Sequence, residues 1–322
     1  MTPLKVFYNS LGTPEMYAMI RSKMAADMTL VTLDTDEDAE RRDKVAGCDV
    51  AIVAAKPLTG PTIAAGDRLR LIHHQGVGYH DTVDLAAARA RGLRLALTPE
   101  GTTIGVAEHA VLLALAAARR VTFADAELRR GHWHVNALRP VSLELYGKTV
   151  GFVGFGRIGR EAARRFAAFG TRTVFHDPGV ADDAAHGAER RPLDWIAGNA
   201  DLISIHVPLT EATRHLVDAA FIARMKPSAI LVNTARGGVV DDAALAAALA
   251  EKRILAAGLD VFEGEPIGPD HPYCALPNVV LTPHISAGTR DALSHKMAAV
   301  FLNLERFRNG EPLANEVDLA TA

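Results

Sequence analysis

The sequence predicts an α/β fold with two doubly wound parallel sheets. Strand-like and helix-like segments alternate along most of the chain, which is typical of parallel sheets joined by crossover helices. A glycine-rich strand-to-helix pattern begins only at residue 148 of 322, and one helical segment follows the last strand-like run. We therefore expect two domains, with the glycine pattern in the second.

The first module carries five strand-like runs separated by turns or helix-like segments. These runs are KVFYN, TLVTLD, DVAIVAA, LRLIHHQ and LRLAL. Helical patterns extend from Pro14 to Ala26 and over DLAAARARG. The first strand-to-helix turn reads FYNSLGTPE and lacks a glycine fingerprint, so this module is not the obvious nucleotide site.

A helix-rich connector extends from Gly101 to Arg130. Its high content of Ala, Leu and Arg predicts one long helix or two joined helices, interrupted only by Gly105. Its longest apolar run, AVLLALAAA, is shorter than the roughly 20 residues that cross a bilayer. We therefore expect a buried or dimer-contact helix and no membrane association.

The next ten residues, GHWHVNALRP, have a loop-like composition. His132 and His134 flank Trp133, a spacing that suggests metal ligands. No carboxylate or cysteine cluster accompanies them in the sequence. We therefore expect no metal site and predict a surface loop with an aromatic anchor.

The second module begins at Lys148 and predicts a six-stranded parallel sheet. Its strand-like runs are TVGFVG, TRTVFHD, DLISIHV, AILVN, AAGLDV and NVVLTP, with helical segments such as DDAALAAALAEK between them. A last helix, Thr289 to Asn309, comes too late to belong to this sheet and predicts a return to the first module. The expected domains are therefore 1–99 with 289–322, and 100–288.

The glycine pattern predicts a dinucleotide site. Gly154, Gly156 and Gly159 follow the strand TVGFV and open a helix, and Asp177 ends the next strand. The glycines permit a tight turn, approach of the pyrophosphate and close helix packing, while helix N-terminal amides face the phosphates. Asp177 would bind the adenosine ribose and repel a 2′-phosphate, so we expect NAD rather than NADP in a Rossmann-like domain.

Three polar side chains follow three successive strands of this module. Arg236 follows AILVN, Glu265 follows AAGLDV and His284 follows NVVLTP. Carboxyl ends of parallel strands share one edge of the sheet, so the three are expected beside the nucleotide. A histidine can move the hydroxyl proton, a carboxylate can orient it, and an arginine can pair with a carboxylate or carbonyl oxygen. This set suits hydride transfer on a 2-hydroxy acid.

Composition and charge limit the partners. The formal net charge of −3 offers no attraction to nucleic acid or to an anionic membrane, so we expect a small soluble substrate. Cys48 and Cys274 have no metal-like spacing and are expected to be inert thiols. The start, MTPLKVFYNS, has no signal-peptide pattern, and we expect a cytoplasmic protein.

Seven stretches resemble the D-isomer-specific 2-hydroxyacid dehydrogenases over nearly the whole chain. They are GVGYHDTVDLAAARARG, VAEHAVLLALAAARR, LYGKTVGFVGFGRIG, LISIHVPLT, MKPSAILVNTARGGVVDDAAL, AAGLDVFEGEP and NVVLTPHISAGT. The resemblance implies Arg236, Glu265 and His284 as the catalytic set, a flavodoxin-like substrate domain, and a homodimer. It implies that the backbone of Gly76, Val77 and Gly78 binds the substrate carboxylate, with Arg236 and His284 also on the substrate. The cofactor contacts it implies, beside the glycines and Asp177, are Arg157, Ile158, Val207, Pro208, Thr234, Ala235, Arg236, Asp260 and His284.

Two departures bear on the substrate. Phosphoglycerate dehydrogenases of this family resemble one another in an arginine after the third strand, where this chain has VAAKPLTGP with only Lys56 nearby. His73, His74, Gln75 and Tyr79 stand beside the substrate loop and either line the pocket or are ordinary strand-end residues. We expect a glyoxylate or hydroxypyruvate type of substrate. The alternatives are 3-phosphoglycerate dehydrogenase activity and a non-catalytic NAD(H)-sensing protein, and the 2-hydroxy acid itself, the direction and the strictness for NAD stay open.

Overall fold

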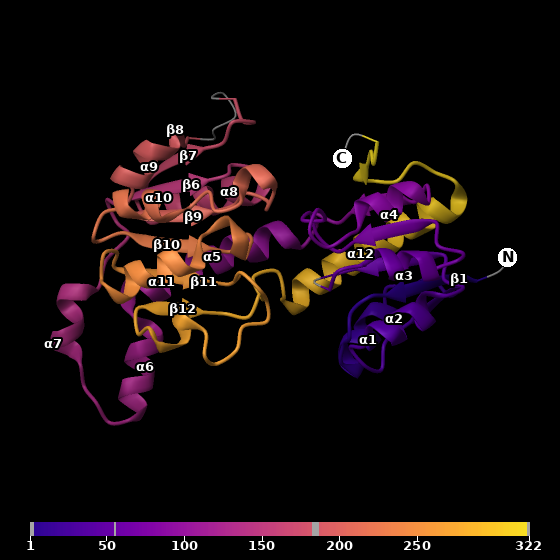
Figure 1. Ribbon diagram of the computed structural model, residues 1–322, viewed down its shortest axis with the longest axis horizontal. Helices are drawn as coiled ribbons and strands as arrows, with labels where there is room; N and C mark the ends of the chain where they lie inside the picture. Colours follow the sequence, from indigo (N-terminus) through magenta and orange to yellow (C-terminus); the bar gives the residue numbers. More distant parts are fainter. Residues whose placement is uncertain (1–2, 55, 182–186, 321–322) are drawn as a thin grey trace. The chain divides into compact units, whose positions relative to one another are not determined.

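A computed structural model describes residues 3–54, 56–181 and 187–320 (Figure 1). The chain forms two compact units, each described by itself. Unit 1 contains Met1–Thr102 and Thr289–Ala322, and unit 2 contains Thr103–Gly288. The sequence-based boundaries were residues 99/100 and 288/289.

Unit 1 is built on a six-stranded sheet in the order β13-β5-β4-β3-β1-β2. The first five strands are parallel, and β13 pairs with β5 in the antiparallel sense. The strands are β1 (Leu4–Tyr8), β2 (Met28–Val31), β3 (Val50–Val53), β4 (Leu71–His74), β5 (Arg94–Leu97) and β13 (Glu316–Val317). The five expected strands are therefore confirmed. The additional strand β13 has only two residues, too few to give a strand pattern in the sequence.

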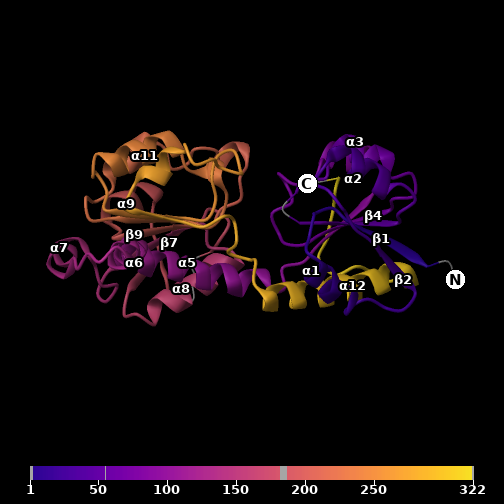
Figure 2. The same cartoon turned by 90° about the horizontal axis from the view of Figure 1, so that it is seen from below.

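Helices cover both faces of this sheet (Figure 2). One core joins α1 and α12 to the sheet, and a second joins α2, α3 and α4 to the opposite face. The helices are α1 (Pro14–Arg21), α2 (Asp38–Val45), α3 (Gly60–Ala65), α4 (Leu85–Ala90) and α12 (Arg290–Asn309). The hydroxyl of Thr289 caps α12 by accepting from Ala292 N, which starts the helix where the sequence predicts it.

Unit 2 is built on a parallel sheet in the order β12-β11-β10-β9-β6-β7-β8. Six of its strands match the predicted runs, and the two-residue β8 at the edge is a seventh that the sequence analysis missed. The strands are β6 (Thr149–Val153), β7 (Arg172–His176), β8 (Glu189–Arg190), β9 (Leu202–Ile205), β10 (Ile230–Asn233), β11 (Ala256–Leu259) and β12 (Val279–Leu281). The switch point between β6 and β9 is typical of dinucleotide-binding sheets.

Helices α5 and α8 pack on one face of this sheet and α9, α10 and α11 on the other (Figure 2). Their bounds, and those of two further helices, are α5 (Thr102–Arg119), α6 (Val121–Arg129), α7 (Val135–Leu138), α8 (Arg157–Ala167), α9 (Leu193–Asn199), α10 (Ala219–Arg224) and α11 (Asp242–Ala250). Short 3-10 turns lie at η1 (Arg139–Val141), η3 (Glu211–Thr213), η4 (Gly237–Val239) and η5 (Pro272–Ala275).

The connector forms two helices, α5 and α6, which is one of the two alternatives expected. Arg120 separates them by adopting a left-handed conformation with φ of 54°. The segment expected to be a loop after α6 contains α7 and η1, so that expectation is wrong in part. Helix α5 is also long and apolar enough to cross a membrane by length and composition. Leu113 and the alanines of α5, except the half-buried Ala116, are buried against the unit 2 sheet instead, as expected for a core helix.

A buried histidine joins the two chain segments of unit 1. His73 on β4 is 1% exposed. Its Nε2 accepts a hydrogen bond from Asn303 Nδ2 of α12 at 2.9 Å, and its Nδ1 lies 3.3 Å from Thr98 Oγ1. Asn303 also exchanges hydrogen bonds with the backbone of Ala314, just before β13. The neutral ring therefore connects the first sheet strands to the last helix.

We predict a pH-dependent stability that comes from this histidine. Burial lowers the pKa of His73 to about 3, whereas the pKa of a histidine in an unfolded chain is about 6.5. Between these values the unfolded chain binds a proton that the folded chain does not. Stability should therefore fall as pH drops below about 6.5, by up to ~1.4 kcal/mol per pH unit from this residue.

The measurement is chemical unfolding at pH 7.5 and pH 5.5 for the wild type and His73→Gln. Glutamine cannot take up the proton, so the variant should lose less stability between the two pH values. His80→Gln serves as the control because the exposed His80 ring meets water in both states. Equal losses in the wild type and His73→Gln would contradict the assignment.

Candidate active site

Two glycines of the fingerprint are required by the packing of unit 2 itself. Gly154 has φ of 94°, and a Cβ there would lie 2.6 Å from the carbonyl carbon of His206. A Cβ on Gly159 would lie 2.4 Å from the carbonyl oxygen of Gly154. Larger residues at either position would therefore clash with backbone, as the tight turn and close helix packing require.

Gly156 is different. A Cβ at this position would have no atom of the described residues within 4 Å. The chain therefore has no internal need for glycine at the start of α8. The open space lies where Arg157, Ile158 and the free amides of the first helical turn begin, which fits a pyrophosphate approaching the helix N-terminus. Val207, followed by Pro208, lies against the same loop.

Asp177 lies beside the glycine loop, just after β7. Its Oδ2 accepts from the amide of Phe155 at 2.7 Å and its Oδ1 from the amide of Gly179 at 2.9 Å. Both bonds fix the carboxylate, and each oxygen keeps acceptor capacity for a ribose hydroxyl. The structure therefore brings together the acid and the glycines that the sequence analysis paired.

The end of β10 presents Thr234, Ala235 and Arg236. The Asn233 side chain fixes this turn, because its Oδ1 accepts from Ala235 N at 3.0 Å and its Nδ2 donates to Arg236 O at 2.9 Å. Thr234 is 6% exposed, and its buried hydroxyl finds no hydrogen-bond partner among the described residues. A buried hydroxyl of this kind fits a group supplied by a bound cofactor.

His284 and Glu265 form a direct pair. His284 Nδ1 lies 2.7 Å from Glu265 Oε2, and the other carboxylate oxygen accepts from Phe262 N at 2.9 Å. The His284 and Glu265 side chains are 36% and 32% exposed. His284 has φ of 53°, a strained conformation for a residue with a side chain and one that is frequent at functional sites. The ring keeps Nε2 available for another molecule.

Asp260 holds the segment that carries His284. Its Oδ1 accepts from Thr282 Oγ1 at 2.6 Å and from Ile285 N at 2.9 Å, and its Oδ2 accepts from Ser286 N at 2.8 Å. Burial alone would raise the pKa of Asp260, but the hydrogen bonds outweigh it and lower the pKa to about 2. Asp260 is thus an ionised anchor at the end of β11. Its contact with the cofactor stays a prediction.

Sequence reasoning missed His109. This residue of α5 places Nε2 2.9 Å from Thr282 Oγ1 and 3.5 Å from Asp260 Oδ1. It is 173 residues from Thr282 in sequence, so only the packing of α5 on the sheet brings the two together. The VAEHAV stretch that carries it was noted for its resemblance alone.

The predicted substrate loop lies in unit 1, after β4. Val77 in this loop is 39% exposed, and Gln75 before it accepts a hydrogen bond from Tyr8 OH at 2.8 Å. His73 and His74 are buried in the strand, and His74 Nε2 lies 2.9 Å from Thr82 Oγ1. The pocket-lining interpretation is therefore wrong for His73, whose ring nitrogens both bond within unit 1.

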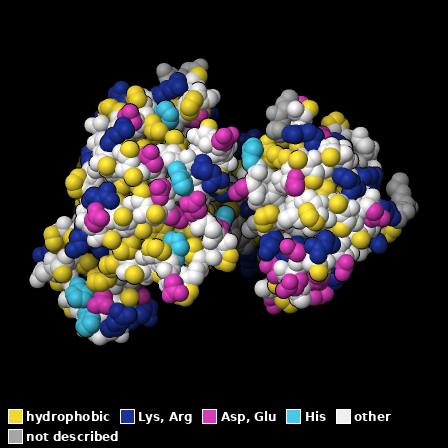
Figure 3. Space-filling model, viewed as in Figure 1, with side chains coloured by type: hydrophobic (Ala, Val, Ile, Leu, Met, Phe, Trp, Pro, Cys, Tyr) yellow, Lys and Arg dark blue, Asp and Glu magenta, His cyan; other side chains and the backbone are white. Residues whose placement is uncertain are grey.

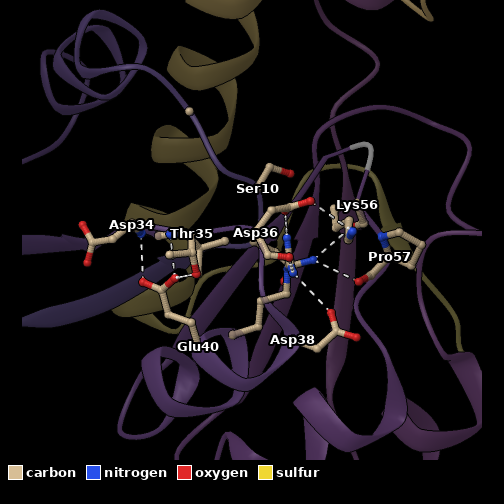
Figure 4. Close-up of polar contacts among 12 residues, drawn as sticks. Ser10, Asp34, Thr35, Asp36, Asp38, Glu40, Lys56 and Pro57 are labelled. Atoms are coloured by element: carbon tan, nitrogen blue, oxygen red, sulfur yellow. Dashed lines mark hydrogen bonds and ion pairs between the residues drawn. The ribbon is translucent and has the colours of Figure 1, made fainter. Parts of the chain in front are cut away.

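Lys56 is paired with an acid. Its Nζ lies 3.2 Å from Asp36 Oδ2, and Asp36 also binds the buried guanidinium of Arg41 (Figure 4). Asp38 is a further acidic partner of Arg41. The one cation of this loop is therefore already paired with a carboxylate.

The argument against a metal at His132 and His134 is wrong in one respect. It rested on the lack of an accompanying carboxylate, but Glu127 of α6 lies against both rings. The carboxylate is five residues before His132, and the turn that ends α6 closes the distance.

Comparisons with known proteins agree with this geometry. The sequence profile of a family described as D-isomer specific 2-hydroxyacid dehydrogenase, NAD binding domain, matches residues 111–286. A glyoxylate reductase of Korarchaeum cryptofilum is 41% identical over 86% of this chain and 84% of its own. A hydroxypyruvate reductase of Thermotoga maritima is 38% identical over 91% of this chain and 94% of its own.

A solved structure extends the likeness to the fold. The TT0316 protein from Thermus thermophilus has a TM-score of 0.87 and 34% sequence identity, over 98% of this chain and 100% of its own. The family profile includes the glycine fingerprint, Arg236, Glu265 and His284. The chain therefore belongs to the D-isomer-specific 2-hydroxyacid dehydrogenases and is an NAD-dependent oxidoreductase of 2-hydroxy acids.

Proposed function

We propose that His284, Glu265 and Arg236 form the catalytic set for a small, unphosphorylated D-2-hydroxy acid and its 2-oxo acid. The observation that carries the proposal is the 2.7 Å contact between His284 Nδ1 and Glu265 Oε2. This contact leaves Nε2 as the nitrogen that exchanges a proton with the substrate. Thr234, Asp177 and the glycine loop hold the cofactor on the same edge of the sheet.

When bound, NAD(H) supplies or accepts the hydride at C2 of the substrate. In reduction, the His284 imidazolium gives the Nε2 proton to the carbonyl oxygen, and in oxidation the neutral ring takes this proton from the hydroxyl. Glu265 accepts from Nδ1 and balances the positive charge of the protonated ring. Arg236 pairs with the substrate carboxylate or carbonyl oxygen through its planar fork.

Two observations support a glyoxylate or hydroxypyruvate type of substrate. The similar proteins from Korarchaeum cryptofilum and Thermotoga maritima bear those names and are matched over 84% and 94% of their own length. Similar D-3-phosphoglycerate dehydrogenases, 39–43% identical, are matched over only about half of theirs. Lys56, the one cation in the VAAKPLTGP stretch, is paired with Asp36. A phosphate there would meet the carboxylate of Asp36 at close range and be repelled.

We also propose that Asp177 makes the enzyme prefer NAD over NADP. The carboxylate is fixed by Phe155 N and Gly179 N, so it cannot turn away from a 2′-phosphate without losing both bonds. Pro178 and Gly179 bring no cation to the same turn. The preference then follows from charge repulsion.

The proposed assembly is a homodimer in the cytoplasm. Large apolar side chains are exposed along the α5–α7 region, more than a monomer surface needs. They are Ile104, Leu112, Val121, Leu128, Trp133 and Val135. The thiols of Cys48 and Cys274 are free, which accords with a reducing compartment.

Light scattering at micromolar concentration tests the proposed homodimer and should give the mass of two chains.

A substrate panel tests the proposed activity. Glyoxylate, hydroxypyruvate, pyruvate, longer 2-oxo acids and 3-phosphohydroxypyruvate are each assayed with NADH and NADPH. We expect the highest kcat/KM with glyoxylate or hydroxypyruvate and NADH. A preference for the phosphorylated acid or for NADPH would contradict the corresponding assignment, and NADH binding without reduction of any acid would favour a sensor.

His284→Ala should lower kcat for reduction by about 100-fold or more, because the proton donor is lost. NADH affinity, measured by fluorescence titration, should change far less than kcat. Glu265→Gln keeps the shape of the side chain but removes its charge. Its kcat should therefore lie between those of the wild type and His284→Ala. His215→Asn is a matched control, because His215 pairs with Glu263 in the same unit outside the proposed set. Wild-type turnover in His284→Ala would contradict the assignment.

The glycine loop offers a second matched pair. Gly156→Ala places a Cβ in open space, so stability should stay near wild type while NADH binding weakens. Gly159→Ala places a Cβ against the Gly154 carbonyl oxygen and should destabilise unit 2 by about 1–3 kcal/mol. Thermal unfolding and NADH titration of both variants separate the two effects. Unchanged NADH affinity in Gly156→Ala would show that the cofactor does not approach this glycine.

A further inference from the structure

The connection between α6 and α7 gathers two histidines and a glutamate outside the active site. His132 Nδ1 lies 2.7 Å from Glu127 Oε2, and His134 Nε2 lies 3.0 Å from the same oxygen. Within the described part of the chain, they form the one group of three potential metal ligands whose donor atoms all lie within 4.8 Å. Figure 3 shows histidine, acidic and basic side chains together over this connection.

The end of α6 brings these residues together. Gly131 has φ of 85°, its amide donates to Leu128 O at 2.9 Å, and the amide of His132 donates to Glu127 O at 2.9 Å. This is the Schellman arrangement, in which the second residue after the C-cap folds back over the last helical turn. His132 is therefore held over Glu127 by backbone hydrogen bonds, without any metal.

His134 is oriented by a second element. Its ring stacks on Phe123 of α6, with centroids 5.7 Å apart and planes at 30°. This stacking holds one face of the His134 ring, and Nε2 points at the Glu127 carboxylate. Arg130 Nη1 binds the other oxygen, Oε1, at 2.8 Å. Two imidazole nitrogens therefore converge on one carboxylate oxygen, whose partner oxygen is already engaged.

The electrostatics suit a cation bound through an ionised carboxylate. The Oε2 atom of the Glu127 carboxylate faces both imidazoles. The positive charge of Arg130 opposes a second cation, but it is held at Oε1 and away from the two nitrogens. Two imidazoles with one carboxylate form a donor set typical of Zn²⁺.

We propose that Glu127, His132 and His134 bind Zn²⁺ and that the ion joins the end of α6 to the start of α7. Bonds of the usual length place the ligand atoms of a tetrahedral zinc about 3.4 Å apart. For zinc to bind, the proton that each ring donates to Glu127 moves to its other ring nitrogen or leaves, and the nitrogen-to-oxygen distances of 2.7 and 3.0 Å open by about half an ångström. His132 is 56% exposed, so the ring can make this adjustment and water can take the fourth position.

The ion would have a structural effect on this region. Trp133 lies between the two histidines and is 79% exposed. Zinc would fix the backbone on both sides of this indole and so order the apolar surface that α6 and α7 present. Because the ion binds the folded arrangement, it should also raise the stability of unit 2.

Isothermal titration with ZnCl2 tests the proposal on the full chain, without an affinity tag and after dialysis against EDTA. We expect a saturable site on each chain at pH 7.5. Glu127→Gln and His132→Gln should each weaken it by about tenfold or more, since each variant loses one of three ligands. His215→Asn should leave the site intact, because the His215–Glu263 pair has a single imidazole.

Two further measurements keep the outcome clear. The titration is repeated in His284→Ala, so that zinc held by the active-site pair is not counted. Circular dichroism and thermal unfolding with and without zinc establish that the Glu127 and His132 variants are folded, and only the wild type should gain stability. The proposal is overturned if the His284→Ala variant, in which Glu127, His132 and His134 are unchanged, shows no saturable zinc site. It is equally overturned if folded Glu127→Gln and His132→Gln bind zinc as tightly as the wild type.

Discussion

The ionised carboxylate of Asp260 is the constraint on which the geometry of the active site depends. A fully buried charge is costly unless every part of it is paired, and here the pairing groups belong to the segment after β12. The amides of Ile285 and Ser286 are held on one side of His284 and the hydroxyl of Thr282 on the other. The strained backbone of His284 is thus imposed by neighbours that have no freedom to relax. A histidine on a free loop would lose this orientation.

A similar logic holds unit 1 together. Its sheet is formed by residues before 103, whereas α12 and β13 come after the whole of unit 2. Apolar burial brings α12 to the sheet, but it does not set the register of a helix along a strand. The hydrogen bonds of His73 and Asn303 set this register, because each forms only when α12 lies at one position along the strand. The position of α12 on the unit 1 sheet is therefore specified although the whole of unit 2 lies between them in the sequence.

Sequence reasoning succeeded where one residue type has one structural consequence. The turn geometry excludes side chains at Gly154 and Gly159, and strand ends place Arg236, Glu265 and His284 on one edge because parallel strands share a direction. It failed where a strand is buried on both faces. In LIHH both histidines are buried, so alternation carries no sign of which side chain meets water. The bond from His109 to Thr282 depends on how a helix lies on a sheet, which no local pattern encodes.

Three glutamates that contact histidines show how the same residue types diverge in chemistry. Glu265 meets one imidazole and one backbone amide, so His284 keeps a nitrogen for proton exchange. Glu263 meets the single imidazole of His215 in an exposed pair. Glu127 meets two imidazoles through one oxygen, because Gly131 lets the chain fold back over the helix end. One imidazole on a carboxylate leaves the second ring nitrogen for proton exchange, whereas two imidazoles on the same oxygen form the donor set that we propose for zinc. The difference is set by the backbone around each glutamate, and the side chains alone do not determine it.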